Sequence, residues 1–181
     1  MKLPIIGVMG SGKEEYAELS AEIGSTIAKL GYNLLTGGGL GVMTAVARAF
    51  MGVSNRKGQS IGIIPMERNP QEGFISRQGY PNPYVEVPIY VPLGIPTAHD
   101  DFRITRNYVN ILTSNVVIAL PGSIGTRNEV ALCLRLNKPV ILYGVSGFFR
   151  DMPEEIPRTN HITEIVEFIK NSLALEKEVL G

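Results

Sequence analysis

Short apolar runs alternate along this chain with longer stretches in which apolar residues recur every three or four positions. The short runs are rich in β-branched residues and too brief for globular helices, which predicts buried strands. These strands are expected at Leu3–Met9, Tyr32–Thr36, Ser60–Pro65, Val85–Val91, Val116–Leu120 and Pro139–Gly144. The longer stretches predict helices over about Glu14–Leu30, Val42–Phe50, Asp100–Ile111 and Glu129–Leu136, and a last helix capped by Thr163. Strands and helices that alternate at this spacing form βαβ units, so we predict an α/β fold with a doubly wound, mainly parallel sheet flanked by helices.

One segment departs from this alternation. The stretch from Pro65 to Pro96 contains seven prolines. From Met66 to about His99 we therefore expect loop, apart from the short strand Val85–Val91. A loop of this length in a compact domain is usually functional or mobile. No repeat, low-complexity segment or linker divides the chain, so residues 1–181 are expected to form a single domain.

The composition suits a globular domain with a sizeable core, since 44% of the 181 residues are hydrophobic and 19% are charged. Basic and acidic residues balance at 17 each, which argues against steering toward nucleic acid or an anionic membrane. We find no signal-peptide pattern and no apolar run near the roughly 20 residues of a membrane span. The single cysteine, Cys133, excludes an internal disulfide and a cysteine-built zinc site. We expect a soluble, cytoplasmic protein.

The stretch from Val116 to Glu129 contains the most chemical information. A predicted buried strand leads there into a glycine turn and then into a helix-forming run; the turn consists of Pro121, Gly122, Ser123, Ile124, Gly125 and Thr126. Glycines let the backbone approach a ligand closely, the first N–H groups of a helix lack intrahelical partners, and the helix dipole favours negative charge. This order of elements predicts an anion site. Thr126 is expected to cap the helix or to donate its hydroxyl to a phosphate, and Glu129 to reach the bound ligand.

Two further glycine turns follow predicted parallel strands. They consist of Gly10, Ser11 and Gly12, and of Gly37, Gly38, Gly39 and Gly41. The carboxyl ends of parallel strands meet at one edge of the sheet, so the three turns are predicted to line one crevice for a phosphate-bearing small molecule. Arg103 and Arg106 lie three residues apart on a predicted helix, which would place both on one face toward that anion.

Two common nucleotide-binding motifs do not fit. Gly7–Lys13 has the spacing of a Walker A loop, but Glu14 stands where serine or threonine would bind magnesium, and no apolar strand ends in a Walker B aspartate. The same turn lacks the third glycine of a dinucleotide fingerprint, because Glu15 stands in its place. An NTPase and a nicotinamide enzyme are therefore disfavoured.

Pro121–Glu129 resembles the P-G-G-x-G-T-x-x-E signature of the Lonely Guy family, whose members were long labelled lysine decarboxylases. Gly37–Met43 is similar to the second motif of that family, and the resemblance extends over about Ile5–Tyr143. It implies a Rossmann-like fold and a homo-oligomer, either a dimer or a tetramer, in which long helices pair between subunits. The candidate interface residues are Val46, Phe50, Leu132, Leu134 and Leu136.

Lonely Guy enzymes hydrolyse the N-glycosidic bond of nucleoside 5'-monophosphates, giving free base and ribose 5-phosphate. By position, Arg106 and Glu129 match their functional arginine and glutamate, whereas Asn107, Thr105 and Ser123 depart from the family pattern. The shorter Gly-Gly-Gly-x-Gly-Val-Met turn and the Arg106-Asn107 pair resemble instead the molybdenum cofactor carrier proteins. Those proteins bind molybdopterin with its molybdenum, protect it and pass it to apo-molybdoenzymes.

The resemblance favours a molybdenum cofactor carrier over an enzyme. The alternative is a phosphoribohydrolase in which Arg106 and Glu129 are catalytic. The expected cofactor-binding residues are Gly10, Ser11, Gly12, Gly37, Gly38, Gly39, Gly41, Arg103, Arg106, Pro121, Gly122, Ser123, Ile124, Gly125, Thr126 and Glu129. The cofactor is expected as cargo, and no other cofactor is expected. Its dithiolene sulfurs already ligate the metal, so no protein metal ligand is needed, and Cys133 is expected to be a small buried residue.

Overall fold

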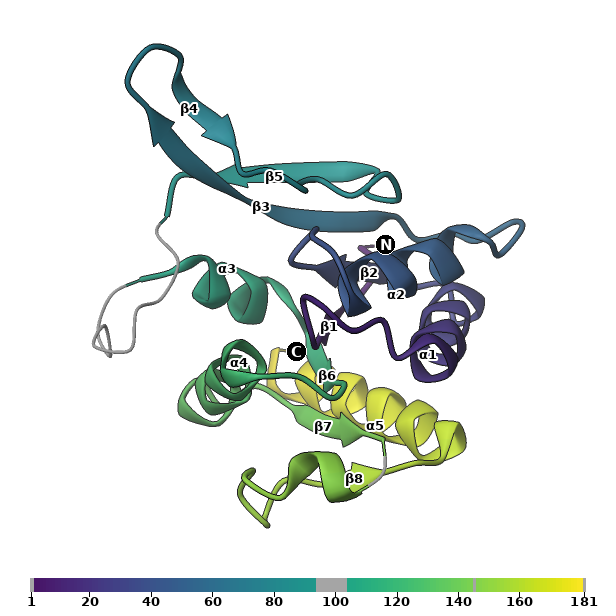
Figure 1. The fold of residues 1–181 in the computed structure, drawn as a ribbon. Helices are drawn as coiled ribbons and strands as arrows, with labels where there is room; N and C mark the ends of the chain where they lie inside the picture. Colours follow the sequence, from purple (N-terminus) through teal and green to yellow (C-terminus); the bar gives the residue numbers. More distant parts are fainter. Residues whose placement is uncertain (1, 94–103, 145, 181) are drawn as a thin grey trace.

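The computed structural model describes residues 2–93, 104–144 and 146–180 (Figure 1). Its strands are β1 (Ile5–Met9), β2 (Asn33–Thr36), β3 (Ser60–Asn69), β4 (Gly73–Ser76), β5 (Val87–Val91), β6 (Val116–Ala119), β7 (Val140–Tyr143) and β8 (Arg158–Thr159). Its helices are α1 (Ala17–Lys29), α2 (Val42–Met51), α3 (Arg106–Thr113), α4 (Ile124–Arg135) and α5 (Ile162–Leu180), with a short 3₁₀ turn at Ser146–Phe149. No described helix is both long and apolar enough to cross a membrane.

The sheet is doubly wound around β1. Strand β1 pairs in parallel with β2 on one side and with β6 on the other. The sheet continues through β3 to β5 on the first side and through β7 to β8 on the second, and all of these pairs are parallel. The chain therefore adds strands outward from β1 on one side and then returns to add β6 on the other, so the order of strands reverses between β1 and β6. In folds of this kind, ligands bind beyond the carboxyl ends of the strands at that reversal.

Helices cover both faces of the sheet, with α1, α2 and α5 on one face and α3 and α4 on the other (Figure 1). The position of β6 between the two layers of helices explains why its sequence is uniformly apolar. Val116 and Ile118 belong to the core beneath the first set of helices, whereas Val117 and Ala119 belong to the core beneath the second. Alternate side chains of a strand point to opposite faces, so a strand buried on both sides needs apolar residues throughout. The predicted Rossmann-like, mainly parallel α/β fold is confirmed.

The expectation of a loop from Met66 was wrong for its first part. Strand β3 continues to Asn69 and pairs antiparallel with β4, so that residues 66–76 form a hairpin. The polar residues Glu67 and Arg68 lie on a part of β3 that extends beyond the sheet core, so the apolar signal used to find strands stops too early. The first residue of β4 after the turn is Gly73, with a φ of 82°, a conformation that glycine adopts readily.

Other element boundaries also differ from expectation. Helix α4 begins at Ile124, inside the glycine signature and before Glu129. Helix α3 begins at Arg106, and its N-cap Thr105 is extended. The predicted helix start at Asp100 lies outside the described residues. Strand β8, only two residues long, carries too little periodicity to be recognised in the sequence.

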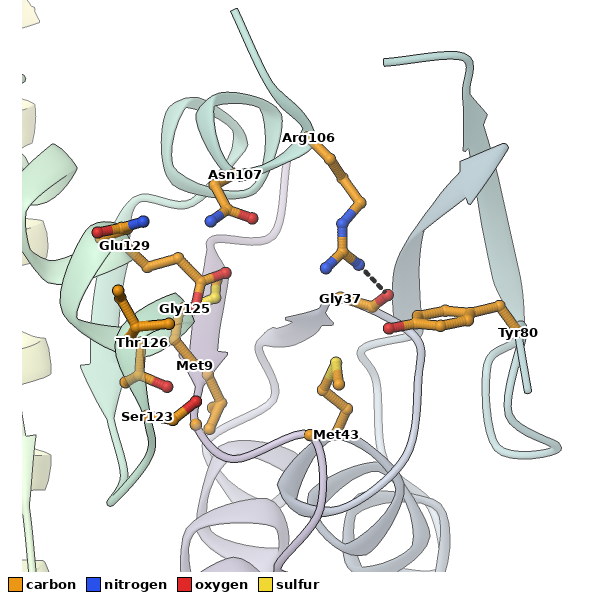
Figure 2. Close-up of a pocket in the computed structure, with 15 residues that line it drawn as sticks. Met9, Gly37, Met43, Tyr80, Arg106, Asn107, Ser123, Gly125, Thr126 and Glu129 are labelled. Carbon is orange, nitrogen blue, oxygen red and sulfur yellow. Dashed lines mark hydrogen bonds between the residues drawn. The ribbon is translucent and has the colours of Figure 1, made fainter. Parts of the chain in front are cut away.

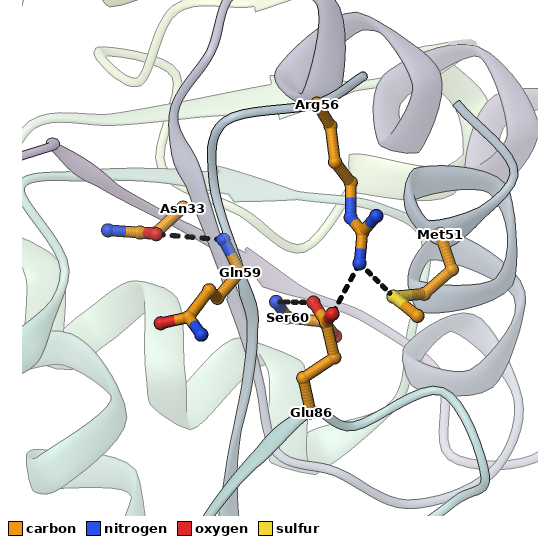
Figure 3. A network of polar contacts seen from close by, with 6 residues as sticks. All are labelled: Asn33, Met51, Arg56, Gln59, Ser60 and Glu86. Carbon is orange, nitrogen blue, oxygen red and sulfur yellow. Dashed lines mark hydrogen bonds and ion pairs between the residues drawn. The ribbon is translucent and has the colours of Figure 1, made fainter. Parts of the chain in front are cut away.

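Strand β5 is fastened to β3 by a polar network at the start of both strands (Figure 3). The Glu86 carboxylate accepts a hydrogen bond from Ser60 N at 2.9 Å and pairs with the Arg56 guanidinium, which also contacts the Met51 sulfur at 3.0 Å. The side chains of Arg56 and Glu86 are only 19% and 29% exposed, so this ion pair is partly desolvated. The guanidinium also lies over the Phe50 ring, 5.5 Å from its centroid. The network thereby fixes the edge of the sheet.

Helices α1 and α2 pack closely across Gly24. A Cβ atom at this position would overlap with the carbonyl oxygen of Val46 and lie 3.0 Å from the Cβ of Ala49. Val46 and Phe50 are both fully buried in the core of the single chain. Their assignment to a subunit interface was therefore wrong, because the core of one chain already buries them. Leu134, in contrast, is 40% exposed on α4.

Candidate functional site

A pocket of about 250 Å³ opens at the carboxyl edge of the sheet, at the point where β1 and β6 diverge (Figure 2). It is lined by the end of β1, by residues that follow β1 and β2, by the first turns of α3 and α4, by α2 and by the segment between β4 and β5. The lining residues are Val8, Met9, Gly10, Gly12, Gly37, Met43, Tyr80, Arg106, Asn107, Ser123, Ile124, Gly125, Thr126, Asn128 and Glu129.

Two helix N-termini meet at this pocket. Helix α4 begins at Ile124 after the extended N-cap Ser123, and helix α3 begins at Arg106 after Thr105. Within the described chain, neither cap residue makes a side-chain capping hydrogen bond. The first N–H groups of a helix have no intrahelical partner and lie at the positive end of its dipole. The first turns of both helices line the pocket, which favours an anion there.

The glycine signature has two distinct structural functions. A Cβ atom on Gly122 would overlap with the hydroxyl of Thr126 and lie 3.1 Å from the carbonyl carbon of Gly10. Gly122 therefore lets two loops approach each other. Gly125 meets nothing within 4 Å at the place of its missing Cβ. It lines the pocket, so the absence of a side chain there keeps the first turn of α4 accessible to a ligand.

Arg106 is held in a defined position above the turn that follows β2. Its Nη1 donates to the carbonyl oxygens of Gly37 at 2.7 Å and Ile63 at 3.2 Å. Its guanidinium also lies over the Tyr80 ring, 5.6 Å from the centroid. Gly37 is required for this arrangement, because a Cβ atom there would lie 2.7 Å from Arg106 Nη1. In Figure 2 a second guanidinium nitrogen points into the pocket, where it can pair with an anion.

Tyr80 forms the opposite wall of the pocket, and Figure 2 shows its hydroxyl directed inward. The segment that contains Tyr80 is tied to the glycine turn by the buried Asn82. The backbone N–H of Asn82 donates to the carbonyl oxygen of Gly38 at 2.8 Å. Its side-chain Nδ2 donates to the carbonyl oxygen of Gly39 at 2.9 Å. The ring of Tyr80 occupies the space that a Cβ atom on Gly39 would need. The triple-glycine turn thus makes room for this wall.

Glu129 contributes a carboxyl group that is only 7% exposed. Its Oε1 accepts a hydrogen bond at 3.1 Å from the side chain of Asn110 on α3. Burial raises the pKa of Glu129 from 4.5 to about 7, although the positive charge of Arg106 and the Asn110 hydrogen bond act in the opposite direction. Near neutral pH this carboxyl can therefore hold or release a proton.

The structure brings many of the predicted binding residues together in one pocket. Those that line it are Gly10, Gly12, Gly37, Arg106, Ser123, Ile124, Gly125, Thr126 and Glu129. Ser11, Gly38, Gly39, Gly41, Pro121 and Gly122 lie in the same turns but not among the lining residues. Ser11, for example, stabilises the first turn through its hydroxyl, which accepts hydrogen bonds from Lys13 N at 3.1 Å and Glu14 N at 2.9 Å. The binding roles of all these residues remain predictions.

The expectations for Thr126, Arg103 and Cys133 have different outcomes. Thr126 is not the helix cap: Ser123 takes that position, and Thr126 lies buried within the first turn of α4. Arg103 lies outside the described residues. Cys133 is fully buried as expected, and burial raises the pKa of its thiol to about 12.

Sequence reasoning did not predict that several residues would line the pocket. These are Val8, Met9, Met43, Tyr80, Asn107 and Asn128. Met9 and Met43 belong to apolar patterns that were interpreted as core. Tyr80 lies in the proline-rich segment, which shows no periodicity. Asn128 is a variable position inside the signature Pro121–Glu129, and it lies in the first turns of α4 because this helix already starts at Ile124. An aromatic residue within a proline-rich segment is the one local signal that could have indicated Tyr80.

The topology and the position of the pocket define a Rossmann-like α/β protein with a cavity at its topological switch point. The model of the SLOG cluster4 family matches residues 3–172. The chain belongs to this family.

Solved structures extend this relationship. The molybdenum cofactor binding protein of Rippkaea orientalis shares 32% sequence identity with this chain at a TM-score of 0.70, over 96% of this chain and 99% of that one. The molybdenum cofactor carrier protein of Chlamydomonas reinhardtii shares 32% identity at a TM-score of 0.67, over the same shares of the two chains. An uncharacterized protein of Archaeoglobus fulgidus is 29% identical over 164 residues, which cover 86% of this chain and 93% of that protein. The resemblance to molybdenum cofactor carrier proteins, predicted from motifs, is confirmed.

Proposed function

We propose that this protein binds molybdenum cofactor as cargo in the pocket at the carboxyl edge of the sheet and transfers it to apo-molybdoenzymes. The observation that carries the proposal is the convergence of two helix N-termini and Arg106 on one open pocket. Similarity to two molybdenum cofactor proteins over 96% of the chain supports it.

The residues of the pocket fit the chemistry of such a cargo. The cofactor is a pterin that carries a phosphate monoester and an oxyanionic metal centre. The first turn of α4, left open at Gly125, suits the phosphate, because backbone N–H groups and the helix dipole both favour an anion. Arg106 suits a second anionic group. The one thiol of the chain, Cys133, is buried on the core side of α4, so the metal would keep the dithiolene sulfurs as its ligands.

A phosphoribohydrolase is the second candidate, and one observation favours it. Arg106 and Glu129 line the same pocket, and the pKa of Glu129 lies at about 7. A carboxyl with that pKa can exchange a proton during catalysis near neutral pH. In that function Glu129 would stabilise the developing charge on the sugar or position water, and Arg106 would orient the phosphate.

The deciding experiment is co-elution. The purified protein is mixed under anaerobic conditions with molybdenum cofactor released from a molybdoenzyme and then gel-filtered. We expect molybdenum and oxidised-pterin fluorescence in the protein peak, and we expect that peak to activate an apo-molybdoenzyme. An empty peak would refute the carrier function. Release of ribose 5-phosphate from adenosine monophosphate, absent in a Glu129→Gln variant, would then establish the hydrolase.

The location of the anion site is tested by Gly125→Asp. The side chain has space, since nothing lies within 4 Å of the added Cβ, so the fold should persist. The new carboxylate would repel an anion at the first turn of α4, and we expect affinity for the cofactor to fall by at least about tenfold. Gly125→Asn, of equal size but uncharged, is the control and should bind more tightly than the aspartate variant. Equal affinity of both variants and the wild type would place the anion elsewhere.

A further inference from the structure

Asn110 lies behind the pocket, on the side of α3 that faces α4. It is fully buried and is not among the residues that line the cavity. Its backbone oxygen accepts hydrogen bonds from Ser114 N at 3.3 Å and from Ser114 Oγ at 2.8 Å. Its side chain therefore starts from a fixed backbone at the end of α3.

The two ends of the Asn110 amide differ in their partners. Nδ2 donates to Glu129 Oε1 at 3.1 Å. Oδ1 is buried and has no hydrogen-bond partner among the described residues. An unpaired buried acceptor is costly, because it has lost water without a replacement. The structure thus holds an unused acceptor beside a carboxyl group that lines the pocket.

The charged and titratable groups around Glu129 come from several elements. Arg106 from α3 stabilises its negative charge. Cys133 lies on α4 one turn further along, and Lys138 follows that helix and acts on the same thiol. Tyr80 lines the pocket from the segment between β4 and β5. Burial raises the pKa of the Cys133 thiol to about 12 and that of Glu129 to about 7, so of these two groups Glu129 is the one that changes its charge near neutral pH.

We propose that Asn110 is a positioning residue for Glu129 that serves both protonation states of its carboxyl group, so that the pocket takes up a proton from solvent when it binds an anion. With Glu129 ionised, Nδ2 donates to the carboxylate as observed. With Glu129 protonated, rotation of the amide by half a turn presents Oδ1 to the carboxylic O–H. The unpaired acceptor then gains a donor.

The direction of the coupling follows from charge. An ionised Glu129 repels an anion in the same pocket, whereas a neutral one does not. Asn110 can present either its Nδ2 donor or its Oδ1 acceptor to the carboxyl group, so each protonation state of Glu129 keeps one hydrogen bond to this amide. The inference rests on the proposed binding of an anion in this pocket, but not on the identity of the cargo.

The test follows the Glu129 carboxyl directly by NMR in protein labelled with ¹³C at the glutamate carboxyl carbons, between about pH 5 and about pH 9. Glu129→Gln identifies the resonance. In the wild type we expect a midpoint of about 7. Asn110→Leu removes both hydrogen bonds, and because the one to the charged carboxylate is the stronger, the midpoint should rise by about one pH unit. Asn110→Ser, too short to reach Glu129, should act in the same direction if the leucine variant does not fold.

Sulfate tests the coupling in the wild type, because it stays a dianion over this range and does not titrate itself. We expect sulfate to raise the Glu129 midpoint relative to chloride at equal ionic strength. An unchanged midpoint in the folded Asn110 variants, or in sulfate, would overturn the inference. Since this experiment needs no cofactor, its failure is distinct from an empty peak in the co-elution experiment.

Discussion

Replacing Glu129 by glutamine should make the protein more stable, and by an amount that depends on pH. The carboxyl group is 7% exposed, and burial is the largest cause of a pKa raised from 4.5 to about 7. Between these two values the folded state binds the Glu129 proton more tightly than the unfolded state does. Stability contributed by this group is therefore present at low pH and is lost as the pH rises toward about 7.

The size of the effect follows from the same values. At about 1.36 kcal/mol for each pH unit, the interval from 4.5 to about 7 corresponds to a cost of about 3 kcal/mol at alkaline pH. At about pH 5.5 only about 1 kcal/mol of that cost is present. Glutamine keeps the shape and an acceptor for Asn110 but carries no charge. The stability advantage of the variant should thus grow by about 2 kcal/mol between about pH 5.5 and about pH 8.5.

The assay is urea unfolding of both proteins at the two pH values, followed by far-UV circular dichroism because the chain contains no tryptophan. Glu15→Gln is the control, since it removes a carboxylate that is 44% exposed in a surface ion pair rather than a buried one. The reasoning is refuted if the difference in unfolding free energy between wild type and Glu129→Gln is the same at both pH values.

Two further predictions concern packing. Gly24→Ala would push a methyl group into a carbonyl oxygen of α2 and should lower the free energy of unfolding by about 1–3 kcal/mol. Gly52→Ala is the control: its Cβ would make only ordinary contacts at 3.5 Å, so the free energy of unfolding should stay unchanged or rise slightly. Glu86→Gln breaks the partly buried pair with Arg56 and should cost about 1–2 kcal/mol, measured by the same unfolding assay, whereas Glu15→Gln should have no measurable effect. If a substitution and its control lowered the free energy of unfolding by similar amounts, the predicted clash at Gly24 or the predicted role of the Arg56–Glu86 pair would be contradicted.

The strands of the core and the glycine turns were predictable because their signals are local. A strand covered by helices on both faces must be apolar throughout, as Val116–Ala119 shows. The turn at Gly37, with Gly38 at a φ of 73°, needs glycine for reasons that short sequence patterns reveal. Arg106 and Glu129 were assigned to one site from the signature and the resemblance, and both line the pocket.

The hairpin of residues 66–76 was missed for a physical reason. Its strands pair mainly with each other and lie beyond the core, so neither face is uniformly covered and no clean alternation arises. The prolines that suggested a loop also mislead here, since Pro70 lies in the turn that joins β3 to β4. The interface assignment of Val46 and Phe50 failed similarly, because apolar spacing shows that a residue is buried but does not show against which partner.

The sequence by itself determined the doubly wound sheet and the edge at which the glycine turns gather, because these follow from periodicity, glycine spacing and chain direction. It also predicts an anionic ligand, and this stays a prediction. Only the tertiary structure decided that Tyr80 forms a wall of the pocket and that Asn110 reaches Glu129 across 19 positions of the chain. It also decided the proton affinity of Glu129, since a pKa depends on the burial and neighbours of the carboxyl group. Those contacts join residues far apart in sequence, and no local pattern encodes them.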